Sequence, residues 1–411
     1  VVAAGSLSAR HAIGEAAALL ESFVEASDEP GDAVREQLAD LYRVSGEYQK
    51  ALVHARAVWA KRSDDAVASH RVGQLLTGAG EYEEAGEVLA TAQRLAIASG
   101  EPRVLAEVEA QLAELQYQSA RYDEAAESGR RALEAAEAAG DRVIEISARN
   151  TLGKLALAQK DPDSAAALFE RNRDQAAAAG LGHQEAQAHT NYAVARLLHR
   201  DLRGAEAACH TAIEVASRVC DTRERAIATE NLAVIAHLGR DYGNALRYYH
   251  QAVGLLKRLG NRAMLARVAN NLGELYLTLG DRGRARGLCE FAARVGGKLP
   301  SSVLGESLLL LGRIDATDGN VTAARDAFRN ARATFDELGS QRAIEAAIEL
   351  ARMALYDGDV SAARSILSGL PLELPAKYQA DLALVTTDLE RAAGADTRVS
   401  ARRAVETAAA C

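Results

Sequence analysis

The chain has 411 residues, of which 26% are charged and only 4% aromatic, and its formal net charge at pH 7 is −9. This acidic, aromatic-poor composition disfavours nucleic-acid binding, which requires basic patches and side chains that stack on bases. No apolar run approaches the roughly 18–20 residues that a membrane-spanning helix requires, so we expect no membrane partner.

The acidic excess belongs to the first part of the chain. Residues 1–160 contain 26 acidic and 17 basic side chains, whereas the remainder has equal numbers of both. The simplest role of such an excess is solubility, and the alternative is a preference for a basic partner.

The N-terminal segment has the pattern of one amphipathic helix. Residues 6–27 are predicted to form this helix, with Ala17 in the place that an alanine occupies in every later unit. Its partner helix is missing and the chain does not begin with Met, which leads us to expect a fragment of a longer protein. We therefore treat residues 1–30 as a truncated first unit.

Residues 31–370 contain a repeat with a period close to 40 residues. Short turns follow one another at spacings of 34, then five of 40, then two of 39. An alanine stands five residues after each turn, and Ala or Gly stands seven residues before it. A fixed period of 20–50 residues indicates a solenoid. The turns are Gly46, Gly80, Ala120, Lys160, Arg200, Arg240, Gly280, Gly319 and Gly358.

Each unit is predicted to be two helices that cross closely at these small residues. In the seventh unit Leu272, Gly273 and Tyr276 share one face of a first helix. Gly280 then breaks the helix, because glycine accepts the left-handed backbone that ends helices. The second helix carries Ala285 and Ala292 on one face.

The C-terminal segment follows two prolines, Pro371 and Pro375. Residues 376–392 and 399–409 are predicted to be terminal helices, so that 371–411 caps the last apolar face of the array. A second irregularity lies at 296–300, where Gly-Gly-Lys-Leu-Pro is predicted to shorten a helix and loosen the joint between units.

The pattern Leu-small, then Tyr near the turn, then Ala with a bulky residue four positions later resembles the tetratricopeptide repeat. The 39–40-residue period is similar to that of kinesin light chains, LGN-type adaptors and the C-terminal sensor domains of bacterial LuxR/MalT-like regulators. The resemblance implies an all-α fold, a right-handed α-solenoid of about nine helix-turn-helix repeats with flanking helices. It covers 31–370, and it specifies the fold far better than the function.

Motifs for catalysis or cofactors are missing from the sequence. It has no Gly-rich phosphate loop, no Gly-x-Ser-x-Gly, no His-Glu-x-x-His and no Cys-x-x-Cys. We therefore expect no enzyme activity and no cofactor. The four cysteines lack metal or redox spacing, which favours reduced thiols in the cytoplasm. His210 and His250 are 40 apart and could face each other across neighbouring repeats, but without a recurring third ligand two solvated side chains are favoured over a metal site.

Asparagine provides the candidate binding site. Asn191, Asn231 and Asn271 each stand nine residues before a turn, and Asn150 and Asn270 stand ten before. In the tetratricopeptide family the first helices line the inside of the superhelix, where an amide can pair with both N–H and C=O of an extended peptide. The alternative is that these amides bond to the neighbouring repeat. The predicted groove comprises Asn150, Lys154, His189, Asn191, Asn231, Arg267, Asn270, Asn271 and Glu274.

Two functions are therefore expected. The first is a non-enzymatic domain of a larger bacterial signalling or regulatory protein that binds a protein or peptide partner in its concave groove. The second is the ligand-sensing arm of an ATP-dependent regulator or kinase, which binds a small molecule or its own effector domain. The Ala- and Arg-rich, Lys-poor composition, which suggests a bacterium, and the absent N-terminal Met favour the second of these functions. Neither the partner nor the oligomeric state follows from the sequence.

Overall fold

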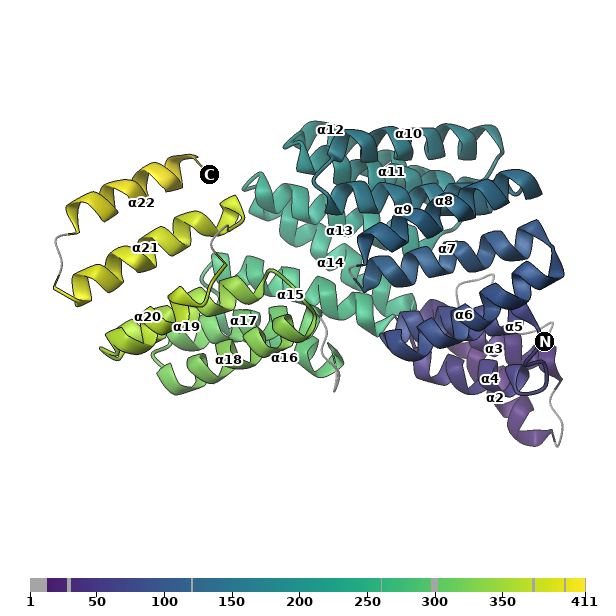
Figure 1. The fold of residues 1–411 in the computed structure, drawn as a ribbon, viewed down its shortest axis with the longest axis horizontal. Helices are drawn as coiled ribbons and strands as arrows, with labels where there is room; N and C mark the ends of the chain where they lie inside the picture. The colour runs from purple at the N-terminus through teal and green to yellow at the C-terminus, as the bar shows by residue number, and fades with distance from the viewer. Residues whose placement is uncertain are drawn as a thin grey trace. The chain divides into compact units, whose positions relative to one another are not determined.

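The structure of the chain is a computed structural model that describes residues 13–27, 31–119, 121–259, 261–296, 302–371, 374–394 and 397–410. Regular secondary structure in these ranges is helical throughout, which confirms the predicted all-α solenoid class (Figure 1). The helices pack into two compact units, Val1–Leu265 and Ala266–Cys411.

The described part of unit 1 consists of a single helix followed by six helix pairs, each a first helix packed on a second. The single helix is α2 (Ile13–Ala26). The pairs are α3 (Asp32–Ser45) with α4 (Tyr48–Trp59), α5 (Ala66–Ala79) with α6 (Tyr82–Ser99), α7 (Pro102–Gln118) with α8 (Tyr122–Ala139), α9 (Arg142–Ala158) with α10 (Pro162–Ala178), α11 (Gly182–Leu198) with α12 (Leu202–Arg218), and α13 (Thr222–Leu238) with α14 (Tyr242–Leu259).

Unit 2 continues the same arrangement over three pairs and ends in two further helices. The boundary at Leu265 falls inside the first of these helices. The helices are α15 (Arg262–Thr278) with α16 (Arg282–Gly296), α17 (Ser302–Thr317) with α18 (Val321–Glu337), α19 (Ala343–Tyr356) with α20 (Val360–Ser368), and then α21 (Ala376–Ala392) and α22 (Arg398–Ala410).

The ends of the array lie close to the segments expected from the sequence. Helices α21 and α22 coincide with the two predicted terminal helices, and α21 packs on both α19 and α22. At the other end α2 begins at Ile13, and the earlier part of the predicted helix over 6–27 lies outside the described residues. Most of the predicted loose joint at 296–300 also lies outside the described residues, and that prediction stays untested. The division between the two units falls within α15.

The turns inside the pairs have the left-handed backbone that ends a helix. Gly46, Gly80, Gly280, Gly319 and Gly358 have φ between 77° and 83°, as glycine readily permits. The same turn in three pairs is made by residues with a side chain, for which this conformation is strained. These residues are Lys160 (φ 61°), Arg200 (φ 59°) and Arg240 (φ 61°), whereas Ala120 lies outside the described residues.

The repeated small residues form the crossing of each helix pair. An alanine five residues after each turn has no exposed surface in any of the nine pairs, so the second helix approaches the first without a gap. Such close packing makes volume changes costly in either direction. These alanines are Ala51, Ala85, Ala125, Ala165, Ala205, Ala245, Ala285, Ala324 and Ala363.

A buried polar network joins α9 to α10. The Arg149 side chain is 1% exposed and donates to Oδ1 of Asn172 at 2.9 Å, to Oε1 of Gln175 at 2.5 Å and to Glu145 at 3.0 Å. Asn172 in turn donates to the carbonyl of Ile146 at 3.0 Å. Burial lowers the pKa of Arg149, and its Nε–H finds no acceptor among the described residues. A charge buried this deeply is tolerated only because these partners surround it.

Candidate functional site

The first helices of unit 1 form a continuous surface. Helix α5 contacts α7, α7 contacts α9, α9 contacts α11 and α11 contacts α13, although each of these helices belongs to a different pair. We call this surface the first-helix wall. Five of the predicted groove residues belong to its helices: Asn150 and Lys154 on α9, His189 and Asn191 on α11, and Asn231 on α13.

Two of the five bond to each other. Nδ2 of Asn191 donates to Oδ1 of Asn150 at 2.5 Å, which joins α11 to α9. Asn150 is only 7% exposed, and Asn191 is half-buried. This pair therefore has the arrangement expected of a tie between repeats, which is the alternative that the sequence left open.

Lys154 is also engaged within the wall. Its Nζ lies 3.1 Å from Oε2 of Glu114 on α7 and 5.8 Å from the ring centre of Tyr117. Both partners come from the preceding first helix, so the ammonium group bridges neighbouring repeats. Because the pair is partly exposed, its contribution to stability is modest.

His189 lies half-buried on α11. Burial is the main cause that lowers its pKa, and the positive charge of Arg173 acts in the same direction, against Glu185 and Asp174. The imidazole is therefore neutral near pH 7, with one nitrogen that donates and one that accepts.

Asn231 differs from the other asparagines of unit 1. Its side chain is half-buried, and the structure gives it no hydrogen bond to any described residue. An amide has two donor hydrogens and two acceptor sites. The amide of Asn231 therefore keeps its hydrogen-bonding capacity with respect to the described residues.

The four predicted residues of unit 2 are placed differently on α15. Asn270 is 2% exposed; its Nδ2 donates to the carbonyl of Val303 at 2.9 Å and its Oδ1 accepts from Ser307 at 2.8 Å. It therefore ties α15 to α17. Asn271 is half-buried, whereas Arg267 and Glu274 are exposed.

Arg267 and Glu274 act electrostatically on Glu306 of α17. Burial raises the pKa of Glu306, and Glu274 adds to this increase, while Arg342 and then Arg267 oppose it. Oε1 of Glu306 lies 2.6 Å from Nη1 of Arg342, which neutralises the carboxylate from within unit 2.

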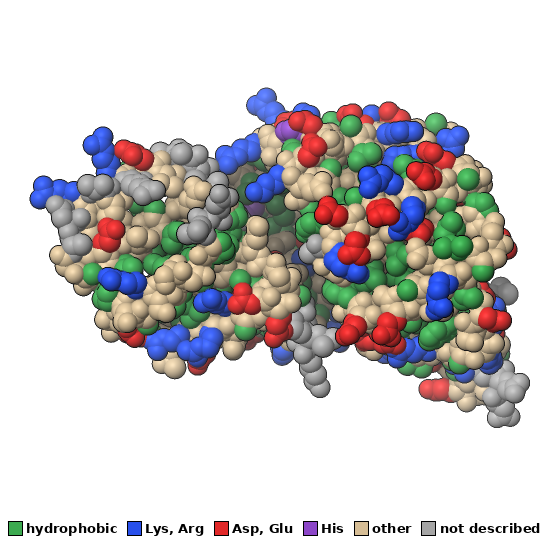
Figure 2. All heavy atoms as spheres, in the orientation of Figure 1, with side chains coloured by type: hydrophobic (Ala, Val, Ile, Leu, Met, Phe, Trp, Pro, Cys, Tyr) green, Lys and Arg blue, Asp and Glu red, His purple; other side chains and the backbone are tan. Residues whose placement is uncertain are grey.

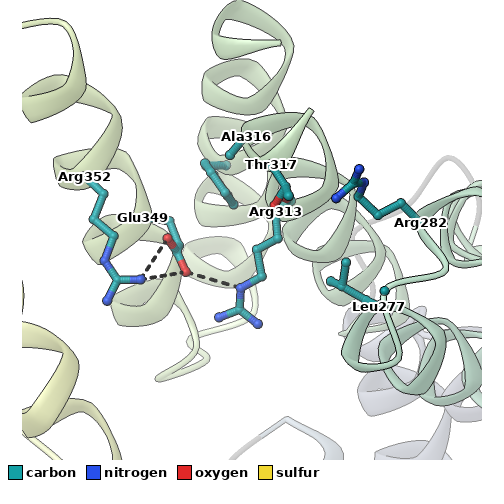
Figure 3. Close-up of a pocket in the computed structure, with 9 residues that line it drawn as sticks. Leu277, Arg282, Arg313, Ala316, Thr317, Glu349 and Arg352 are labelled. Atoms are coloured by element: carbon teal, nitrogen blue, oxygen red, sulfur yellow. Dashed lines mark hydrogen bonds and ion pairs between the residues drawn. The ribbon is translucent and has the colours of Figure 1, made fainter. Parts of the chain in front are cut away.

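A pocket of about 470 Å³ opens in unit 2, lined by residues of α15 to α19. In Figure 3, Arg313 and Arg352 reach Glu349 from opposite sides, and its Oε1 lies 3.2 Å from Nε of Arg313 and 3.4 Å from Nη1 of Arg352. Each arginine of the lining also pairs with a carboxylate that is not part of the lining: Arg313 with Glu345, Arg352 with Asp381 and Arg282 with Asp318. The charges of this pocket are thus already balanced by the chain itself.

The charged residues that join neighbouring first helices share one position of the sequence repeat, which the asparagine pattern does not include. Glu114, Lys154, Arg313 and Arg352 all directly follow the small residue of the first helix. In the structure they reach across to the neighbouring first helix or pair with a residue that does. Reading this one position along the array would have indicated the charged pairs between repeats.

The histidines and cysteines provide few other candidate sites in the described part of the chain. No group of three or more His, Cys, Asp or Glu side chains is placed to hold a metal ion there, and His210 lies near Glu206, at 3.9 Å. Cys209 and Cys289 are buried, which raises the pKa of each thiol to about 12.

Within the described ranges, every helix is too short or too polar to cross a bilayer. On the face seen in Figure 2, acidic and basic side chains are interspersed.

The described helices have a tetratricopeptide-like repeat fold. No family model matches the sequence, and no curated protein matches it either. Among solved structures, a Rap protein complexed with competence and sporulation factor is similar with a TM-score of 0.55 and 14% identity, over 83% of this chain and 97% of that one. The apo form of RapI is similar over 66% of this chain and 99% of that one, with a TM-score of 0.51 and 13% identity.

A third similar structure is a signal-transduction ATPase with a tetratricopeptide repeat sensor from Pyrococcus horikoshii. The TM-score is 0.54 and the identity 13%, over 82% of this chain and 52% of that one. At such low identities the likeness concerns the fold alone.

Proposed function

We propose that the chain is a non-enzymatic recognition domain that binds a protein or peptide partner on the first-helix wall of unit 1. The observation that carries this proposal is Asn231, whose half-buried amide makes no hydrogen bond to a described residue. Its neighbours in the array, Asn191 and Lys154, are held in place by bonds between repeats. A fixed wall with one available amide suits recognition of a peptide backbone.

The similar folds support this class of function. One of the Rap structures contains competence and sporulation factor, so a solenoid with this arrangement of helices can accommodate a bound ligand. His189, with one donor and one acceptor nitrogen, provides a second polar contact on the same wall.

The test compares two variants that introduce the same charge and bulk. Asn231→Arg obstructs the wall on α13, whereas Gln251→Arg places the same side chain at an exposed position on α14, the second helix of that pair. Each variant and the wild type are used to capture proteins from the source organism, and mass spectrometry identifies those that the wild type and Gln251→Arg retain but Asn231→Arg loses. The affinities of these proteins are then measured with purified components.

We expect Asn231→Ala to lower the affinity for the purified partner by about 5–150-fold, because a buried group of the partner that is left unpaired costs roughly 1–3 kcal/mol. Equal affinity of Asn231→Arg and the wild type would place the partner elsewhere. Loss of binding in Gln251→Arg as well would show that the second helices contribute.

The second candidate is a sensing arm of a larger regulator. It is favoured by the similarity to an ATPase whose repeat sensor accounts for only part of its length, since the match spans 52% of that chain. An NTPase loop or kinase motif in a longer form of the protein, together with thermal stabilisation by a small metabolite rather than by a peptide, would support this function over the first.

A further inference from the structure

Unit 1 contains a contact between its first helix pair and the segment that begins α15. Asn261 stands directly before α15 and is 6% exposed. Its Nδ2 donates to the carbonyl of Val44, near the end of α3, at 3.4 Å. The two residues are 217 positions apart, whereas Asn191 and Asn150, which join neighbouring repeats, are 41 apart.

Gly46 makes room for this contact. It forms the left-handed turn after α3 with φ 77°, and a Cβ added there would lie 3.0 Å from Oδ1 of Asn261. The amide of Asn261 thus packs against a turn that has no side chain. Gly80, the same turn in the next pair, has φ 83°, and a Cβ added there would meet nothing within 4 Å.

Asn261 has a separate local role. Its Oδ1 accepts from the backbone N–H of Met264 at 3.0 Å, which caps α15. The oxygen therefore accepts a hydrogen bond from the local helix α15, and the nitrogen donates one to the residue near the distant turn. This division allows the two roles to be separated by substitution.

We propose that Asn261 is a latch that closes unit 1 on itself. In arrays of helical repeats the contacts are between neighbours, so the ends of a stack can separate without disturbing the intervening repeats. The contact with Val44 and Gly46 couples the first pair to the end of the sixth. A hydrogen bond of 3.4 Å is weak, so the latch opens more readily than the pairs unfold. Opening frees the first-helix wall to change its curvature.

The first experiment measures amide hydrogen exchange in the full chain for two substitutions. Asn261→Asp keeps an oxygen that caps α15 but loses the donor and places a carboxylate against the Val44 carbonyl. Asn261→Ala loses both roles. We expect exchange at residues 44–47 to increase at least threefold in both variants, and exchange at 263–266 to increase only in Asn261→Ala. Asp141→Ala, which removes the corresponding cap of α9, should affect only the start of α9. Unchanged exchange at 44–47 in both Asn261 variants would overturn the latch.

The second experiment approaches the contact from the other side. Gly46→Ala and Gly80→Ala introduce the same strain at a left-handed turn, but only the first introduces a methyl group next to Asn261. We expect faster exchange at 261–265 in Gly46→Ala and not in Gly80→Ala. Equal behaviour of the two variants would mean that the closed form is not populated.

Discussion

Gly153 on α9 and Phe169 on α10 meet so closely that a Cβ on the glycine would lie 2.5 Å from Cε1 of the ring. The helix pair therefore depends on the missing side chain. We predict that Gly153→Ala destabilises unit 1 by about 1–3 kcal/mol, because the ring must leave its packed position. Thermal or denaturant unfolding measures this effect.

Gly254→Ala is the matched control in α14, where an added Cβ meets nothing within 4 Å. Alanine is the better helix former by about 1 kcal/mol, so this variant should be more stable than the wild type. We expect the change in stability to have opposite signs in the two variants. The same sign in both would show that packing does not decide the effect of Gly153→Ala.

The repeat alanines should tolerate no larger side chain. Ala205→Leu or Ala245→Leu places extra atoms into a crossing with no exposed surface, and we expect a loss of about 1–3 kcal/mol. Ala207→Leu, at an exposed position of the same helix as Ala205, should change stability by less than about 0.5 kcal/mol. Melting curves that are identical for Ala205→Leu and Ala207→Leu would argue against this register.

Substitution by glycine at the strained turns should increase the stability of the protein. Lys160 and Arg240 occupy the left-handed region, which costs a residue with a side chain about 1–2 kcal/mol. Glycine removes this strain but has more freedom in the unfolded chain, so Lys160→Gly or Arg240→Gly should stabilise by about 0.5–1 kcal/mol. The reverse change, Gly280→Arg, should destabilise. Denaturant midpoints that stay constant in all three variants would contradict this expectation.

Glu224 makes the stability of unit 1 dependent on pH. The side chain is 3% exposed, and burial raises its pKa above the ordinary value of 4.5, despite opposing effects of Thr190 and Arg223. The folded state thus holds the proton of Glu224 more tightly than the unfolded state does. The contribution of this proton to the free energy of unfolding is therefore full below about pH 4.5 and is lost as pH rises through the raised pKa.

Glu224→Gln should therefore be more stable than the wild type at pH 7, with a difference that shrinks as pH falls towards 4.5. The measurement is unfolding at several pH values, with Glu206→Gln at an exposed position as the control. A constant difference across this range would mean that Glu224 is not the group responsible.

The two kinds of asparagine on the first-helix wall should separate by their effect on stability. Asn191→Ala leaves Oδ1 of the buried Asn150 without its donor, and we expect a loss of about 1–3 kcal/mol. Asn231→Ala removes no hydrogen bond to a described residue and should change the melting temperature little. Equal losses in both variants would indicate that Asn231 is also a tie between repeats.

The sequence was sufficient for the fold because its signal is local and repeated. A small residue on each first helix and an alanine on each second helix determine how a pair crosses, and the turn between them lies at a fixed distance from both. Even Lys160 and Arg240, which lack the glycine typical of such turns, were placed correctly by the period. A pattern that appears nine times tolerates several departures.

The contacts of the polar residues could not be predicted in the same way. Whether Asn191 bonds to Asn150 or faces a partner depends on the stagger between neighbouring first helices, which the period does not determine. The contact of Asn261 with Val44 is harder still, since it depends on small rotations that accumulate over six pairs. The proposed binding role of Asn231 remains a prediction.

The buried guanidinium of Arg149 limits how the repeats of this chain can be exchanged. Duplication of one unit would yield interchangeable copies if every crossing were apolar. Forty residues after Asn172 and Gln175, however, α12 carries Ala212 and Val215, both buried. A recombinant that placed α12 opposite α9 would leave Arg149 facing two aliphatic side chains. An exchange that keeps this buried charge paired must therefore move α9 and α10 together, as a single genetic module.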